Sequence, residues 1–186
     1  MKELSLNVLD ITQNSITAGA KRIEISLTED EKGILTLRIA DDGCGMSQET
    51  VKRVIDPFYT TRTTRKVGMG IPLLKLAAEQ TGGEVTIASR TVQEDPEDHG
   101  TVVTATFDTN SIDFTPVGDM VSTMCTIIQG HPEVDYQFVH KTPRFDVGLD
   151  TVQLRAVLGE DVPLSRYEII AWISDYLTQQ YQNENQ

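Results

Sequence analysis

The segment Asp41-Asp42-Gly43-Cys44-Gly45-Met46 decides the fold of this chain, because it joins a strand pattern to a glycine-containing loop. Directly before it, Leu35, Leu37 and Ile39 alternate with other residues, which predicts a strand with one apolar face. A carboxylate at the end of a strand can accept a hydrogen bond from an exocyclic amine, and the two glycines let a ligand approach the backbone closely. The alternative is a plain turn, since Asp and Gly are both common turn residues.

Periodicity on both sides of this segment predicts alternating helices and strands. Strands are predicted over residues 21–28 and 35–39, from Val85, and over Thr101–Phe107. Helices are predicted over residues 3–18, 47–54 and 69–80. Ser47 is the expected N-cap of the second helix, and Gly82-Gly83 ends the third.

Asp10 and Asn14 are four residues apart on the first predicted helix and therefore share one face. An Asn oxygen is a hard neutral ligand for Mg²⁺, which takes few protein ligands and otherwise prefers waters and phosphate oxygens. A carboxylate one turn away can orient a water molecule towards a phosphate. The same pair of residues also occurs on many solvated helix faces, so it indicates a site only together with other motifs.

A second glycine motif, Gly68-Met69-Gly70, opens the third predicted helix. Such glycines let backbone N–H groups point at phosphates, and the dipole of a helix N-terminus favours an anion. Arg62, Arg65 and Lys66 precede it and could pair with phosphates. The alternatives are a plain helix entry and a solvated loop. No Walker A run is present in the sequence.

The order of these motifs resembles the N, G1, F, G2 and G3 boxes of the GHKL ATPase superfamily (gyrase, heat-shock chaperone, histidine kinase, MutL). The boxes fall at Asp10…Asn14, Asp41–Met46, Asp56–Arg62, Gly68–Ile71 and His99–Val102, in that order. Asn14–Ile23 and Asp41–Met46 resemble MutL-type ATPases, whereas Pro57–Arg62 and Gly68–Lys75 resemble the catalytic domains of histidine kinases. The resemblance covers the first 105 or so residues, and it implies a Bergerat fold for residues 1–110.

The resemblance also implies the roles of particular residues. Asn14 would ligate Mg²⁺, Asp41 would receive the adenine amino group of ATP, and Asp10 stands where hydrolysing members have a glutamate base. The residues expected to contact ATP are Asn14, Asp41, Gly43, Gly45, Met46, Phe58, Arg62, Lys66, Gly68, Gly70, Ile71 and Thr101. Three departures from the family pattern are visible: Asp10 is one methylene shorter than glutamate, Lys66 replaces a glycine, and the lid between Phe58 and Gly68 is short.

Composition excludes several classes of protein. The net charge is −12, with −5 on residues 1–110 and −7 on residues 111–186, so nucleic-acid binding is not expected. No apolar run is long enough for a membrane span, so no membrane association is expected either. Cys44 and Cys125 lie far apart and have no metal-ligand spacing, which favours a reducing, cytoplasmic location.

The pattern of residues 111–186 predicts a small α+β module of unknown role, separated from the first domain near Thr109–Pro116. The predicted order of elements is helix, strand, strand, helix and helix. Asp150 is the expected N-cap of the first helix after the two strands. Trp172 is predicted to lie in the core rather than at an interface. The whole chain is therefore expected to be α+β, a two-layer α/β sandwich with this small module at its C-terminus.

Two functions follow from the resemblance, and the sequence leaves both open. The first is an enzyme that binds Mg-ATP and either hydrolyses it slowly or transfers the phosphoryl group to a partner protein in trans. The second is a non-catalytic, nucleotide-dependent regulatory module that acts on a protein partner, with a homodimer as a further option. A third reading, an ATPase linked to DNA as in MutL, conflicts with the negative charge of both parts of the chain.

Overall fold

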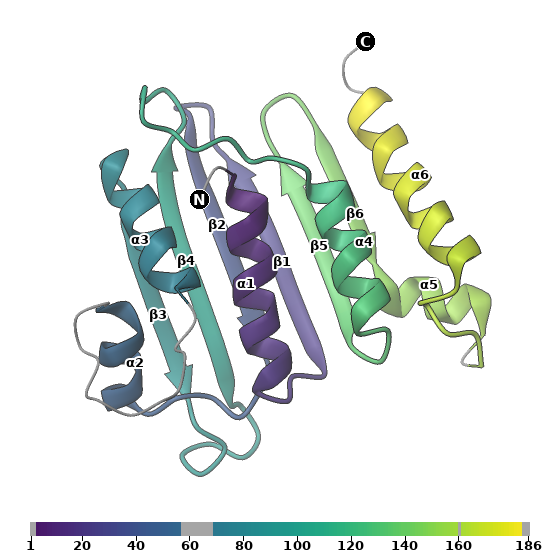
Figure 1. Cartoon of the computed structure of the whole chain (residues 1–186), viewed down its shortest axis with the longest axis horizontal. Coiled ribbons are helices and arrows are strands. Elements are labelled where there is room, and N and C mark those ends of the chain that lie inside the picture. Colours follow the sequence, from purple (N-terminus) through teal and green to yellow (C-terminus); the bar gives the residue numbers. More distant parts are fainter. Residues whose placement is uncertain (1–2, 57–68, 160, 184–186) are drawn as a thin grey trace.

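A computed structural model describes residues 3–56, 69–159 and 161–183 as one six-stranded sheet with its helices (Figure 1). The strands are β1 (Arg22–Glu29), β2 (Ile34–Asp41), β3 (Val85–Arg90), β4 (Gly100–Asp108), β5 (Asp135–Lys141) and β6 (Asp146–Asp150). The helices are α1 (Leu4–Thr17), α2 (Gln48–Ile55), α3 (Gly70–Gln80), α4 (Met120–Gly130), α5 (Thr151–Leu158) and α6 (Tyr167–Asn183). The strand order in the sheet is β3-β4-β2-β1-β5-β6.

The two strands predicted around the acidic turn form an antiparallel pair, as expected. Ile25 lies opposite Ile39 and Leu27 opposite Leu37, and all four side chains are buried. Because successive strand residues point to opposite faces, this register places the buried apolar residues of the pair on one face. The alternation in the sequence therefore determined which face of the sheet is covered.

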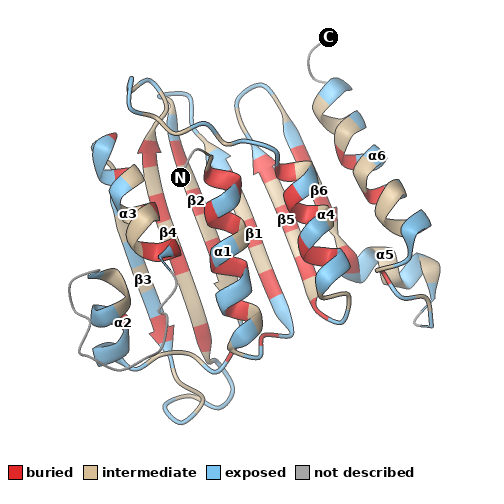
Figure 2. Cartoon of the chain, viewed as in Figure 1, coloured by how far each residue is buried: buried red, intermediate tan, exposed pale blue. Residues whose placement is uncertain are grey.

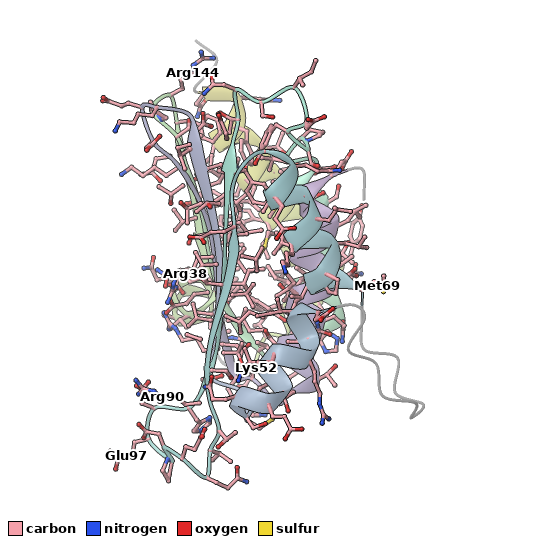
Figure 3. All side chains as sticks on the ribbon, turned by 90° about the vertical axis from the view of Figure 1, so that its left-hand side faces the viewer. Arg38, Lys52, Met69, Arg90, Glu97 and Arg144 are labelled. Atoms are coloured by element: carbon pink, nitrogen blue, oxygen red, sulfur yellow. The ribbon has the colours of Figure 1, made fainter. Side chains whose placement is uncertain are left out.

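Helices cover that apolar face and form the second layer of the sandwich. Leu4, Val8 and Ile11 of α1 and Leu74 of α3 are buried, and together with the strand residues they form one continuous core. Figure 2 shows the buried residues as red bands on the strands and on the helices that lie over them. Figure 3 shows the sheet edge-on, with Arg38 pointing away from the helices on the opposite, more polar face. This is the α+β, Bergerat-type arrangement that the resemblance implied.

The C-terminal part of the chain extends the same sheet. β5 lies parallel to β1, with Ile25 opposite Phe138, and β6 pairs with β5 in the antiparallel sense. The buried side chains of Phe138 and Leu177 belong to the same core as those of α1. The division of the chain at residues 110 and 111 therefore stays a prediction about independent folding, because the core itself is continuous across it.

The connection between the two parts also holds the start of α1. The N–H groups of Leu4 and Ser5 donate to the carbonyl oxygens of Pro116 and Val117, at 2.9 and 2.8 Å. These bonds satisfy N–H groups that would otherwise have no partner at the helix N-terminus. α1 is thus fixed between α3 on one side and α4 on the other.

Candidate functional site

A cavity of about 220 Å³ lies between α1 and the adjoining ends of β2 and β4. α1 and its C-cap residue Ala18 contribute one helix face to its wall, at spacings of three and four residues: Ile11, Asn14, Ser15 and Ala18. The other walls come from the loop after β2, from α2, from the start of α3 and from β4, through Asp41, Gly45, Met46, Val54, Ile71, Thr101 and Val103. Most of these side chains are apolar, and the few polar ones can therefore fix the orientation of a ligand.

The carboxylate of Asp41 has a fixed position in this cavity. Its Oδ2 accepts a hydrogen bond of 2.5 Å from the hydroxyl of Ser15, and its Oδ1 accepts one of 3.0 Å from the N–H of Gly43. Both donors hold the carboxylate group in one orientation, and each carboxylate oxygen keeps a further lone pair. Asp41 can therefore still accept a hydrogen bond from an amine in the cavity.

The loop after β2 lies so close to its neighbours that glycine is required at two positions. Gly45 has a φ of +70°, and a Cβ there would lie 1.8 Å from the carbonyl oxygen of Arg90. Gly100 has a φ of +134°, and a Cβ there would lie 1.9 Å from the carbonyl oxygen of Asp41. These close approaches join the loop to the ends of β3 and β4.

Ser89 and His99 hold the same loop by hydrogen bonds. The buried hydroxyl of Ser89 accepts from the N–H of Met46 at 2.8 Å, donates to the carbonyl of Gly100, and lies 2.8 Å from the hydroxyl of Thr101. Nδ1 of His99 lies 2.6 Å from the carbonyl oxygen of Gly43. The floor of the cavity is therefore pre-organised by residues that do not themselves belong to the predicted site.

The N-terminus of α3 lies beside Asp10. A Cβ on Gly70 would be 3.0 Å from the Cβ of Asp10 and 3.7 Å from its Oδ2. The N-cap residue Met69 makes no side-chain cap, and Pro72 has no N–H, so the N–H groups of the first turn belong to Gly70 and Ile71. Helix N-termini of this kind bind anions, because their N–H groups and the helix dipole both favour negative charge.

Asp10 and Asn14 are both exposed on the side of α1 that carries the cavity wall. Within the described residues, no cluster of three or more His, Cys, Asp or Glu is arranged to hold a metal ion. A single amide oxygen such as that of Asn14 nevertheless suits Mg²⁺, which keeps waters and phosphate oxygens as most of its ligands. The donor set at this end of the cavity is therefore compatible with a metal that arrives with a phosphate ligand.

The structure gathers most of the predicted site residues that it describes. Asn14, Asp41, Gly45, Met46, Ile71 and Thr101 line the cavity, Gly43 binds Asp41, and Gly70 adjoins Asp10. The predicted contacts Phe58, Arg62, Lys66 and Gly68 lie outside the described residues.

Sequence reasoning missed the residues that support the site. Ser15 and Ala18 share a helix face with Asn14, so the helical spacing alone was a signal for them. Ser89 gave no signal in the sequence, and His99 appeared only as the first residue of the fifth box. Their partners Met46 and Gly43 are more than forty residues away, so local sequence did not indicate these contacts.

Comparison with known proteins gives both sequence relatives and structural neighbours. The MutL mismatch repair protein of Rhizorhabdus wittichii is 38% identical over 53 residues, covering 28% of this chain and 9% of that protein. The signal transduction histidine-protein kinase AtoS of Escherichia coli is 29% identical over 89 residues, covering 48% of this chain and 14% of that protein. The chain thus spans less than a fifth of the length of these curated relatives.

A structure described as the Aquifex aeolicus MutL ATPase domain complexed with ADP superimposes with a TM-score of 0.53. That alignment has 15% identity and covers 75% of this chain and 60% of the other. At this identity the likeness establishes the fold. The family model for the histidine kinase-, DNA gyrase B- and HSP90-like ATPases matches residues 1–111, which is more than half of the chain. The chain therefore belongs to the histidine kinase-, DNA gyrase B- and HSP90-like ATPase family, the GHKL superfamily.

Proposed function

We propose that this protein binds Mg-ATP in the cavity beside α1, with the adenine at Asp41 and the phosphates towards the N-terminus of α3. The observation that carries the proposal is the Asp41 carboxylate, which Ser15 and Gly43 hold in place while leaving it able to accept from the adenine amino group. The ADP complex of the structurally similar MutL domain supports a nucleotide in this fold.

Calorimetry with Mg-ATP on the wild type and on Asp41→Asn tests the adenine end. An amide has one acceptor oxygen and two N–H donors, so the asparagine of this variant cannot accept from Ser15, from Gly43 and from the adenine amine together. We expect binding to weaken by about 10²-fold or more. Asp42→Asn is the matched control, because Oδ1 of Asp42 accepts from the N–H groups of Lys21 and Arg22, outside the cavity. Equal affinities of wild type and Asp41→Asn would contradict the proposal.

At the phosphate end, we propose that Asp10 orients the group that attacks the γ-phosphate. Its carboxylate is exposed and lies beside Gly70, where the first turn of α3 would receive phosphate oxygens. Mg²⁺, held by Asn14 and the phosphates, would neutralise phosphate charge when it is bound. The reaction is then slow hydrolysis when water attacks, or phosphoryl transfer when a partner protein supplies the acceptor.

Phosphate release by Asp10→Asn and Asp10→Glu tests this role. Asparagine cannot take up a proton from water, so we expect hydrolysis to fall by about 10²-fold while ATP affinity stays within about twofold. Glutamate restores the longer carboxylate and is expected to raise the rate. Identical rates for wild type and Asp10→Asn would exclude Asp10 as the base and would favour transfer to a partner or the absence of turnover.

The second candidate function, a regulatory module without turnover, is favoured by the packing of three helices. α1 carries Asp10 and Asn14 and packs on α4, and α4 packs on α6, so a nucleotide-dependent shift of α1 has a direct path to the C-terminal part. Amide hydrogen exchange of α6 with ATP and with ADP tests this candidate. Equal protection in both states would contradict it, because a ligand shifts an equilibrium only through differential affinity.

A further inference from the structure

A second and larger cavity, of about 710 Å³, lies far from the candidate nucleotide site, among β5, β6, α5 and α6. It is an open groove, and we call it the C-terminal groove. The paired strands contribute Phe138 and Leu149, and the two helices contribute the remaining apolar wall: Leu154, Val157, Leu158, Ile169, Trp172 and Tyr176. Figure 1 shows α5 and α6 beside β6, at the end of the sheet opposite to β3.

The apolar wall of this groove is unusually exposed. Val157 is 85% exposed, Trp172 is 48% exposed and Tyr176 is 39% exposed. The rings of Trp172 and Tyr176 are stacked, with centroids 4.9 Å apart and an interplanar angle of 10°. The prediction that Trp172 lies in the core was therefore wrong, because its side chain stacks on Tyr176 and lines the groove, where about half of the residue stays exposed. Contiguous exposed apolar and aromatic surface of this kind marks binding sites.

The edge strand next to the groove has the backbone groups of its central residue, Gly148, occupied. The side-chain amide of Gln180 donates to the carbonyl of Gly148 and accepts from its N–H, both at 3.0 Å. Asp150, also on β6, uses its carboxylate to cap α5 at Val152 and Gln153. A partner that added a strand here would have to displace Gln180, so the groove suits a partner that inserts side chains, as a helix does.

The charged residues that line the groove are acidic. Asp150 and Glu168 line it, and none of its described lining residues is Lys, Arg or His. Within the described part of the chain, the carboxylate of Glu168 forms no hydrogen bond or ion pair, whereas that of Asp150 caps α5. Asp150 and Glu168 therefore give the groove an acidic rim, whose charge a cationic partner would neutralise.

We propose that the C-terminal groove binds an amphipathic helix of a partner protein, with an apolar face flanked by Lys or Arg. Leucine-sized side chains at positions i, i+3, i+4 and i+7 of that helix would contact Trp172, Tyr176 and Val157. Its basic residues would meet Glu168 and Asp150 at the rim. This binding activity goes beyond the proposed ATP binding and does not depend on it.

Trp172 is the sole tryptophan of the chain, so its fluorescence reports directly on the groove. The probe is a synthetic helical peptide without Trp or Tyr, with leucines on one face and lysines beside them. Two peptides serve as controls: one has glutamate in place of lysine, and one has the same composition with the leucine spacing scrambled. We expect a saturable blue shift of the Trp172 emission with the first peptide alone, and weaker binding as the salt concentration rises.

Matched variants distinguish peptide binding in the groove from a general attraction of the basic peptide to an acidic protein. Glu168→Lys and Glu84→Lys change the net charge equally, but Glu84 is an exposed residue beside β3, at the other end of the sheet. We expect Glu168→Lys to weaken peptide binding about tenfold and Glu84→Lys to change it less than about twofold. Val157→Arg introduces a cation at a highly exposed position of the apolar wall, so it should leave folding intact and abolish the blue shift.

Three results would overturn the proposal. The first is the absence of any shift with the lysine peptide, and the second is an equal shift with the glutamate or the scrambled peptide. The third is a concentration-dependent dimer of the free protein, seen by sedimentation, that Val157→Arg converts to a monomer. That result would make a second copy of this chain the occupant of the groove instead of a basic helix.

Discussion

Gly45 and Gly82 both have a positive φ, of +70° and +80°, but their surroundings differ. A Cβ on Gly45 would overlap the carbonyl oxygen of Arg90, whereas a Cβ on Gly82 would have no atom within 4 Å. Any L side chain is strained at such a φ, but only at position 45 would the backbone of the loop also have to move. The two positions therefore separate the conformational role of glycine from its role in close packing.

We predict that Gly45→Ala destabilises the protein by about 3 kcal/mol or more, and Gly82→Ala by about 1–2 kcal/mol. Urea unfolding of the two variants measures the difference. We further expect Gly45→Ala to weaken ATP binding, because the loop that carries Asp41, Gly43 and Met46 would shift. Equal losses of stability in the two variants would show that the close approach of Gly45 to the carbonyl oxygen of Arg90 adds nothing to the cost of the substitution.

At the scale of single elements, the edge strand β6 depends on a helix side chain. Gln180 of α6 satisfies both backbone groups of Gly148, so the edge of the sheet is covered although no seventh strand is present among the described residues. Natural sheets protect their edges in such ways, because a free edge is a template for aggregation.

We predict that Gln180→Ala lowers the free energy of unfolding by about 1–2 kcal/mol and increases aggregation on mild heating. Gln179→Ala is the control, since Gln179 is exposed and is the neighbouring residue on the same helix. Urea unfolding and light scattering measure the two effects. A Gln180→Ala variant as stable as the control would mean that water replaces the amide without loss.

The packing of β5 against α6 also predicts a dependence of stability on pH. His140 is buried next to Phe145 and Tyr181, and its Nδ1 lies 2.8 Å from the hydroxyl of Tyr181. Burial lowers the pKa of His140 from 6.5 to about 4, because the charged imidazolium is disfavoured away from water. The unfolded chain therefore binds a proton between these values while the folded chain does not, and stability falls as the pH decreases from 6.5 towards 4.

We predict that this one histidine contributes a loss of about 2–3 kcal/mol between pH 6.5 and pH 4. Urea unfolding of the wild type and of His140→Phe across this range measures it. Phenylalanine keeps an aromatic ring beside Phe145 and removes the titration, so the curve of the variant should be flatter in this window. Parallel curves would show that other groups cause the acid sensitivity.

At the scale of the whole molecule, the family domain and the C-terminal part share one sheet and one core. β1 is an internal strand only because β5 pairs with it, and the face of α1 that meets α4 is covered only when residues beyond 111 are present. None of the described helices is both long and apolar enough to cross a membrane.

We predict that a fragment of residues 1–110 is less stable than the intact chain by more than about 3 kcal/mol, because it exposes the edge of β1 and part of the core. Co-expression with residues 111–186 should restore a folded complex. Urea unfolding and size-exclusion chromatography test both expectations. A fragment as stable as the intact chain would instead support an independent domain that ends near residue 110.

The local elements could be predicted from the sequence, because each was encoded by neighbouring residues. Alternation predicted β1 and β2, and the polar residues before α2 and α5 predicted their starts. Ser47 accepts from the N–H of Thr50, and Asp150 accepts from the N–H of Val152, as N-caps do. The order of the polar and glycine motifs was likewise sufficient to identify the family, which the match to residues 1–111 confirms.

Only the tertiary structure decided the order of the strands, the residues that hold the site in place and the exposure of Trp172. β5 lies beside β1, although more than one hundred residues separate them, and Ser89 holds Met46 from a distant strand. Trp172 has the helical spacing of a core residue, yet α5 and β6 leave part of its ring exposed in a groove. Periodicity shows that a side chain lies on an apolar face, but which element covers that face depends on long-range packing, and local sequence does not encode it.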